Sequence, residues 1–115
     1  MKQTEFRIVL VTCASLAEAR KIARAVVEQQ LAACVNISTA SVESIYRWKD
    51  RVETAQEYLL VMKSAERRLP ELQHAVKEFH SYDVPEFIVL PVASGSKQYL
   101  DWVSESIQPT KRSRK

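Results

Sequence analysis

The hydrophobic positions of the chain first show the short period of β-strands. Residues 6–12 (Phe-Arg-Ile-Val-Leu-Val-Thr) are almost all apolar or β-branched, which is typical of a strand covered on both faces. Residues 33–38 and 42–49 alternate between apolar and polar side chains, and residues 57–63 and 87–92 are further apolar runs. These segments predict the strands of one sheet.

Other segments repeat their apolar residues with the helical period. Ser15 and Glu18 form a capping box, in which the serine accepts a backbone N–H and the glutamate returns to the cap, so a helix is predicted to begin there. Pro70 fits only the first turn of a helix, which predicts a second helix from residues 67–69 to Phe79. Residues 96–105 predict a short C-terminal helix after Gly95. The two main apolar stripes are Ala19, Ile22, Ala23, Val26 and Val27, and Leu69, Leu72, Val76 and Phe79.

The order of elements is strand, helix, strand, strand, helix, strand, helix. This order predicts an α+β, ferredoxin-like βαββαβ fold with both main helices on one face of an antiparallel sheet. With 115 residues, the chain has the size of a single domain, which we expect at residues 1–107. Such a fold hosts many unrelated functions, so function must be argued from a site.

A long hairpin is the most unusual expected element. Val42, Ser44, Tyr46 and Trp48 share one face of the strand at 42–49, and the turn is expected within residues 50–56. A two-stranded ribbon is marginal alone, and exposed aromatic residues need cover. The pattern therefore predicts that the hairpin packs against a second subunit.

The net charge of +3 belongs to the C-terminal end. Lys111, Arg112, Arg114 and Lys115 are four of the 17 basic residues, which leaves 13 against 14 acidic residues and a body with net charge −1. We expect residues 108–115 to be a basic disordered tail. Basic and acidic residues alternate along both main helices, which argues against a nucleic-acid face. No apolar run is long enough to span a membrane, and a cytoplasmic protein is expected.

Candidate chemistry gathers at residues 80–86 (His-Ser-Tyr-Asp-Val-Pro-Glu), where a helix is predicted to end and a strand to begin. His74 and His80 lie about 240° apart around a helix, so one helix cannot chelate a metal with both. Cys13 and Cys34 are 21 residues apart, which excludes a local zinc knuckle or a CxxC pair. Reduced thiols are expected, with Cys34 packed as a small hydrophobic residue.

Several separated motifs carry a family resemblance. Residues 31–37 (Leu-Ala-Ala-Cys-Val-Asn-Ile), 44–48 (Ser-Ile-Tyr-Arg-Trp), 80–86 and 99–102 (Tyr-Leu-Asp-Trp), with Lys63, resemble the CutA divalent-cation tolerance family over residues 6–103. The resemblance implies a stable homotrimer whose hairpins pack across subunits. It also implies a role in tolerance of copper and other divalent ions, with no established enzymatic activity.

The resemblance also points to candidate site residues. The copper site of a bacterial relative falls on positions that here are Val11, Phe79 and His80, and only His80 can bind a metal. We therefore expect no required cofactor and weak binding of copper or another divalent ion at His80. The candidate cleft residues are Tyr46, Trp48, Lys63, Tyr82 and Glu86. Two positions depart from the family's motifs. Ser81 stands where the family usually has the proline of His-Pro-Tyr, and Asp50 stands where it usually has the glycine of Trp-x-Gly.

Three other functions compete with this reading. A trimeric signalling protein of nitrogen-regulatory architecture would bind a small anionic metabolite at an intersubunit cleft lined by Lys63 and Arg47. An enzyme would pair Cys34, as a thiolate, with His80 as base. An RNA-binding module is the least favoured, because the central strands lack exposed aromatic pairs for base stacking.

Overall fold

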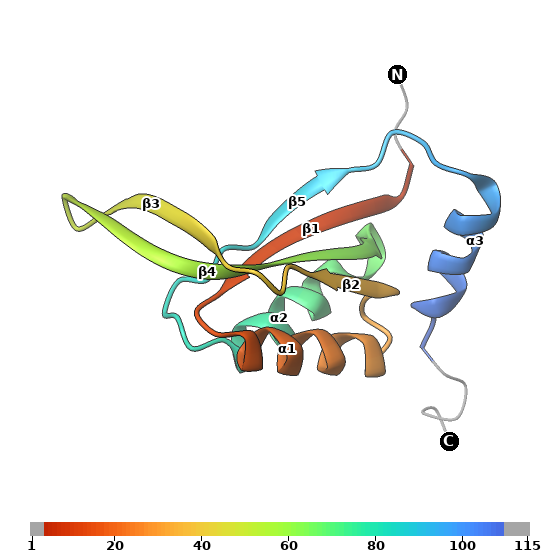
Figure 1. Ribbon diagram of the computed structural model, residues 1–115. Helices are drawn as coiled ribbons and strands as arrows, with labels where there is room; N and C mark the ends of the chain where they lie inside the picture. Colours follow the sequence, from red (N-terminus) through yellow and green to blue (C-terminus); the bar gives the residue numbers. More distant parts are fainter. Residues whose placement is uncertain (1–3, 110–115) are drawn as a thin grey trace.

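The computed structural model describes residues 4–109, which form a helical layer against an antiparallel sheet (Figure 1). The elements are β1 (Phe6–Cys13), α1 (Leu16–Glu28), β2 (Cys34–Ile37), β3 (Val42–Trp48), β4 (Arg51–Ala65), the 3-10 helix η1 (Glu66–Arg68), α2 (Leu69–Phe79), β5 (Ile88–Pro91) and α3 (Lys97–Ser106). The strand order is β2-β4-β1-β5, and β3 pairs with the outer part of β4. Strands β2 and β3 thus act as one interrupted strand, and the predicted ferredoxin-like arrangement is confirmed.

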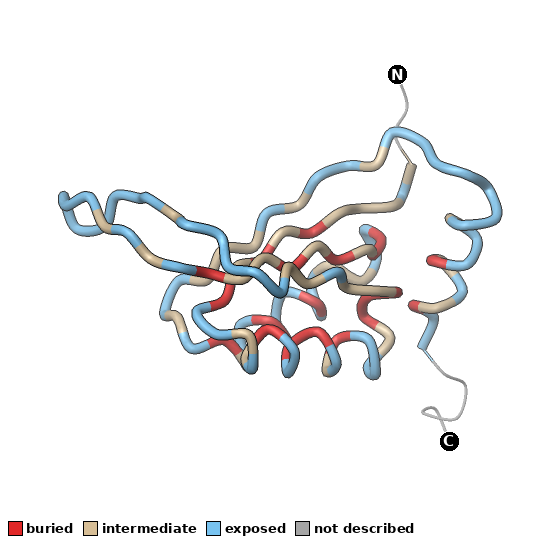
Figure 2. The backbone as a smooth tube through the Cα atoms, in the orientation of Figure 1, coloured by how far each residue is buried: buried red, intermediate tan, exposed pale blue. Residues whose placement is uncertain are grey.

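The main core lies between the sheet and helices α1 and α2, which cover the same face of it (Figure 2). Its fully buried side chains come from both layers: Val9, Val11, Leu60 and Met62 from strands, and Ile22, Val26, Leu72 and Val76 from helices. Each such side chain contributes about 1.5–3 kcal/mol by leaving water. The predicted helix stripes are confirmed except at Val27, which is 39% exposed and lies at the edge of its stripe.

The other face of the sheet is covered by neither α1 nor α2, and it carries an apolar patch beside the polar side chains of Lys63 and Asn36. Side chains alternate along a strand, so Ile8 and Leu10 point away from the buried Val9 and Val11. Their partners on β5 are Leu90 and Ile88, which are 43% and 48% exposed. Apolar side chains gathered on an exposed sheet face are common at contacts between protein molecules.

Helix α3 packs at the end of the sheet around a second, smaller core. Val103 and Ile107 are buried there with Ala33 and Ala65. Trp102 is 43% exposed, so it does not fill the core of the chain. Residues 110–115 of the predicted basic tail lie outside the described residues. No helix within residues 4–109 is long and apolar enough to cross a membrane.

The hairpin of β3 and β4 projects from the sheet, but its turn was wrongly predicted within residues 50–56. Trp48 pairs with Arg51, so only Lys49 and Asp50 form the turn. Their φ angles of 51° and 66° are left-handed, as a tight two-residue hairpin turn requires. Glycine usually marks such a turn, but aspartate also tolerates this conformation. Residues 51–56 therefore belong to β4, and the ribbon is longer than expected.

The start of α1 also differs from its prediction in one contact. The Ser15 hydroxyl accepts the Glu18 backbone N–H at 3.1 Å, as a capping box requires. The Glu18 carboxylate instead accepts the backbone N–H of Ser81 at 3.2 Å. A contact across 63 residues has replaced the local one, and it ties α1 to the turn that follows α2.

Candidate functional site

Three metal-binding side chains converge at one end of the sheet. Cys13 ends β1, Glu18 lies in the first turn of α1, and His80 caps the C-terminus of α2. One donor atom from each lies within 4.8 Å of the other two. Cys13 is fully buried and His80 is only 9% exposed. We call this group the Cys13–Glu18–His80 cluster.

The hydrogen bonds of His80 define its tautomer. Nε2 lies 2.7 Å from the carbonyl oxygen of Thr12, which can only accept, so Nε2 carries the proton. Nδ1 accepts the backbone N–H of Tyr82 at 3.1 Å and lies 3.3 Å from Oε2 of Glu18. The lone pair that would bind a metal ion is thus on the nitrogen that faces the cluster.

The Cys13 thiol is held in its protonated form. Burial, with smaller contributions from the carboxylates of Glu18 and Glu57, raises the pKa of Cys13 to about 12. Without a cation nearby, very little of the Cys13 thiol is ionised, so Cys13 does not act as a nucleophile by itself. A metal ion at the cluster would have to displace this proton.

A cleft of about 550 Å³ lies beside the cluster, between the hairpin, along β3, and the turn after α2. We call it the aromatic cleft. Its lining residues are Thr12, Ser44, Ile45, Tyr46, Trp48, Glu57, Tyr82, Asp83, Val84 and Glu86. Four of the five predicted cleft residues are therefore brought together by the fold, although they come from segments more than 30 residues apart.

Buried charge dominates the inner end of the aromatic cleft. The Tyr82 hydroxyl donates to Oε2 of Glu57 at 2.7 Å, and Glu57 is only 8% exposed. Burial and this hydrogen bond raise the pKa of Tyr82 above its ordinary range. Burial first, and then the neighbouring Glu57 carboxylate, raise the pKa of Glu86, while a hydrogen bond with Thr12 opposes this rise. The cleft thus holds two carboxylates close to each other.

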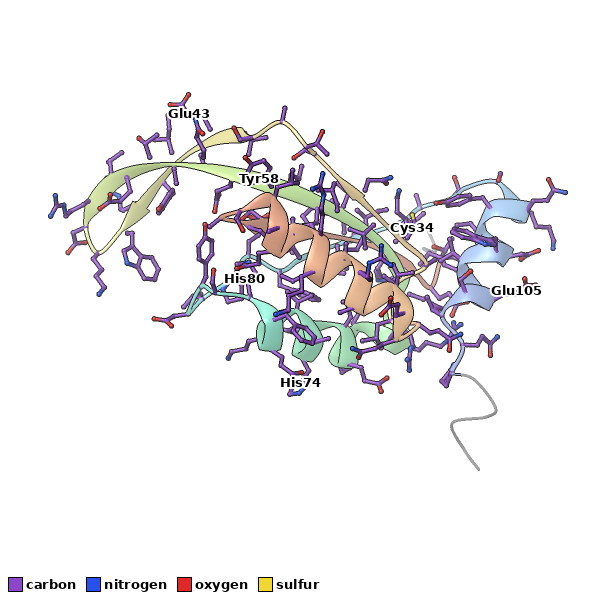
Figure 3. All side chains as sticks on the ribbon, turned by 60° about the horizontal axis from the view of Figure 1, so that its bottom comes forward. Cys34, Glu43, Tyr58, His74, His80 and Glu105 are labelled. Atoms are coloured by element: carbon purple, nitrogen blue, oxygen red, sulfur yellow. The ribbon has the colours of Figure 1, made fainter. Side chains whose placement is uncertain are left out.

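Lys63, the fifth predicted cleft residue, lies elsewhere on the sheet. It pairs with Cys34 across β2 and β4, and its ammonium group donates to Asn36 and lies 3.7 Å from the Cys34 sulfur. Cys34 is half-buried and also contacts the Tyr99 hydroxyl at 3.6 Å, so it is not a packed core residue. Figure 3 shows Cys34 and His80 well apart, which removes the geometric basis for a catalytic pair.

Val11 and Phe79, which occupy two ligand positions of the copper site implied by the resemblance, both pack as apolar residues. Val11 is fully buried in the main core, and Phe79 packs against that core with the ammonium group of Lys21 5.7 Å from its ring centre. His74 is exposed on α2, away from His80, as the helical spacing predicts (Figure 3). His80 is thus the one predicted metal ligand that the structure places among other donors.

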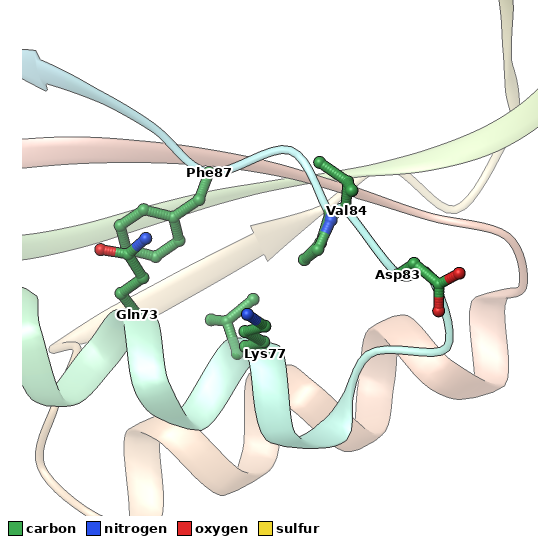
Figure 4. A pocket seen from close by; sticks show the side chains of 7 residues that line it. Gln73, Lys77, Asp83, Val84 and Phe87 are labelled. Carbon is green, nitrogen blue, oxygen red and sulfur yellow. The ribbon is translucent and has the colours of Figure 1, made fainter. Parts of the chain in front are cut away.

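A second hollow, between α2 and the loop before β5, is smaller (Figure 4). It measures about 210 Å³ and is lined by Gln73, Val76, Lys77, Asp83, Val84, Pro85 and Phe87. Pockets for small molecules usually measure about 300–1,000 Å³. The aromatic cleft is within that range and this hollow is below it.

Three site residues were missed by the sequence interpretation. Glu18 was assigned to a helix cap, Cys13 had no recognisable partner, and Glu57 lay in the predicted strand 57–63 without a special role. Their partners His80 and Tyr82 lie at least 25 residues away in the chain. The one sequence signal they shared was their position near the end of a strand or helix, where binding and catalytic residues are common.

Comparison with known proteins agrees with the fold. Residues 7–106 match the family described as CutA1 divalent ion tolerance protein. The chain is 48% identical over 99 residues to the divalent-cation tolerance protein CutA of Thermus thermophilus, covering 86% of this chain and 95% of that protein. It is 40% identical to the chloroplastic protein CutA of Arabidopsis thaliana, of which it spans 54%.

A solved structure supports the same assignment. The divalent cation tolerance protein (Cut A1) of Thermus thermophilus superposes with a TM-score of 0.87 and 46% identity, covering 90% of this chain and 99% of that chain. The sequence match and the structural match both extend over nearly the whole folded region. This chain therefore belongs to the CutA1 divalent ion tolerance protein family.

Proposed function

We propose that this protein serves divalent-cation tolerance as a cytoplasmic homotrimer that binds a divalent metal ion, copper most strongly, at His80 with Cys13 and Glu18. The observation that carries the proposal is the convergence of three donor atoms within 4.8 Å. Imidazole, thiolate and carboxylate together suit Cu(II) and Zn(II), and copper has the highest affinity among the first-row divalent ions.

The same geometry predicts that binding is weak. A metal ion must displace the Tyr82 N–H from Nδ1 of His80 and a proton from the Cys13 thiol. It must also enter a cluster in which Cys13 has no exposed surface. These costs reduce the affinity for the metal ion. Weak binding is also expected because Val11 and Phe79 replace two of the three ligands of the relative's copper site.

Self-association is supported by the uncovered face of the sheet. Ile88 and Leu90 lie at the edge strand β5, which pairs only with β1 among the described strands. On the hairpin, Ile45 and Val52 are 68% and 66% exposed. A second and third copy of the chain would cover this surface, and the number three comes from the family resemblance.

The anionic-metabolite alternative, which places the ligand between subunits, gains no support from the aromatic cleft of the single chain. Its lining includes Glu57, Asp83 and Glu86 and contains neither lysine nor arginine. Arg47 and Lys63, the expected anion ligands, are not part of it.

Calorimetric titration of copper tests the metal proposal. The native protein is compared with His80→Ala and with the matched control His74→Ala, which removes an exposed histidine from the same helix. We expect His80→Ala to lose at least about tenfold in affinity and His74→Ala to bind as the native protein does. Equal binding by the native protein and His80→Ala would place the metal elsewhere and refute the proposal.

A further inference from the structure

The segment that follows α2, residues 81–86, is held to the rest of the chain by its first two backbone N–H groups. The N–H of Ser81 donates to Oε2 of Glu18 at 3.2 Å, and the N–H of Tyr82 donates to Nδ1 of His80 at 3.1 Å. Within residues 4–109, no backbone N–H of this segment donates to a backbone carbonyl. Both acceptors are side chains of the metal cluster.

These two hydrogen bonds occupy atoms that a metal ion needs. Nε2 of His80 donates to the carbonyl oxygen of Thr12, so Nδ1 has the one lone pair of the ring that can bind a metal. Nδ1 cannot accept the Tyr82 N–H and bind an ion at the same time. Oε2 of Glu18, which accepts the Ser81 N–H, lies 3.3 Å from Nδ1. The metal ion and the segment therefore compete for the same two side chains.

The segment can leave these atoms without unwinding α2. His80 is the C-cap residue, and its backbone is already extended, with a φ of −89° and a ψ of 141°. The chain thus departs from the helix before Ser81, and the residues beyond it belong to no helix or strand. The side chain of His80 can stay in place while the two N–H groups turn away from the cluster.

We propose that residues 81–86 form a latch on the metal cluster, closed by the N–H groups of Ser81 and Tyr82 and opened by the bound metal ion. This inference rests on the proposed metal site and adds a change of shape to it. A ligand shifts a conformational equilibrium through a difference in its affinity for the two states, and here the closed state excludes the ion from Nδ1. Ser81 thereby lowers the affinity for metal although it is not a ligand.

Hydrogen exchange of the native protein, measured by mass spectrometry with and without Zn(II), tests the latch. Zn(II) suits imidazole, thiolate and carboxylate ligands and does not oxidise a thiol. We expect saturating Zn(II) to speed exchange about threefold or more in the peptide that contains Ser81 and Tyr82, because both N–H groups lose their acceptors. A peptide from α3 (Lys97–Ser106) is the control and should not change. A site that simply tightens around its ion would slow exchange in the segment.

Two variants of Ser81 separate its N–H from its side chain. Ser81→Pro removes the N–H, and the extended backbone of His80 is the conformation that a residue before proline requires. Ser81→Ala keeps the N–H and removes the hydroxyl. In calorimetric titration, we expect Ser81→Pro to bind Zn(II) about tenfold more tightly than the native protein, because a hydrogen bond to a charged acceptor no longer competes. Ser81→Ala should bind like the native protein.

The latch and the metal site fail in different ways. If Zn(II) binds and His80→Ala weakens the binding, but exchange in the segment is unchanged or slower, the latch is refuted and the metal site stands. Equal affinities for Ser81→Pro and Ser81→Ala would also refute the latch. If the native protein binds no Zn(II), or no more tightly than His80→Ala, the metal site is wrong and the latch is refuted with it. The exchange comparison uses the native protein, so it decides even if Ser81→Pro fails to fold.

Discussion

Replacing Tyr82 with phenylalanine tests the contact that joins the turn after α2 to the hairpin. The change removes a hydroxyl that donates to Oε2 of Glu57 at 2.7 Å and keeps the ring in place. A hydrogen bond to a charged group contributes about 1.5–3 kcal/mol, and a buried acceptor left without its donor keeps the cost of burial. Tyr82 is half-buried and water reaches the cleft, so we expect a loss of about 1.5–2 kcal/mol per protomer.

Denaturant unfolding at one fixed protomer concentration measures this loss, because oligomer stability depends on concentration. Tyr99→Phe is the control, since among residues 4–109 its hydroxyl contacts only the Cys34 sulfur, at 3.6 Å, and the loss of this contact should cost less than about 0.5 kcal/mol. In a Glu57→Gln background, the cost of Tyr82→Phe should fall to about 1 kcal/mol, because the acceptor is then neutral. Equal losses for Tyr82→Phe and Tyr99→Phe would refute the argument.

Three further predictions concern assembly, the pH dependence of stability and the C-terminal helix. Light scattering should report about three times the protomer mass of 13.2 kDa for the native protein and for the control variant Val27→Lys on α1. Leu90→Lys, on the uncovered sheet face, should give a smaller mass. A native mass near 13 kDa would contradict the trimer. The raised pKa of Glu86 means that the folded state holds its proton more tightly, so stability falls as pH rises from the ordinary value of 4.5 through the raised one. Melting temperatures between pH 4 and 7 should show a smaller decline for Glu86→Gln than for the native protein, and parallel curves would contradict the assignment. Ile107→Ala should cost about 2–4 kcal/mol in denaturant unfolding because Ile107 is fully buried, and a loss below about 1 kcal/mol would show that α3 packs loosely.

The fold was predictable because local patterns and tertiary packing agree. The apolar stripe around Ile22 faces the strand that contains Val9, and both are fully buried. Pro70 marked the start of α2, and the structure places it in the first turn. The hairpin turn was the exception, because Lys49 and Asp50 adopt left-handed backbone without the glycine that usually announces it.

The candidate site was only partly predictable, for a physical reason. His80, Tyr82 and Glu86 were visible as polar residues at a helix-to-strand junction. Glu18 was assigned to a local capping box, whereas its carboxylate is used by Ser81, and no pattern in one sequence reports such a distant contact. Lys63 was grouped with the cleft by resemblance alone, and the pairing of β2 with β4 places it beside Cys34 instead.

Tyr82 connects the metal cluster with the aromatic cleft. Tyr82 donates its backbone N–H to His80 and its hydroxyl to Glu57, so it contacts both sites. A metal ion that takes Nδ1 of His80 must break the first of these bonds.

The electronic spectrum of the Co(II)-loaded protein tests the central claim most directly, that one metal ion is held by β1, α1 and the end of α2 together. Cobalt bound to a thiolate gives an intense near-ultraviolet charge-transfer band, which imidazole and carboxylate ligands alone do not give. We expect this band in the native protein and in Cys34→Ser, and its loss in Cys13→Ser and His80→Ala. A band that survives in Cys13→Ser but disappears in Cys34→Ser would contradict the account, because the metal would then lie beside Lys63 and Tyr99 at the other end of the sheet.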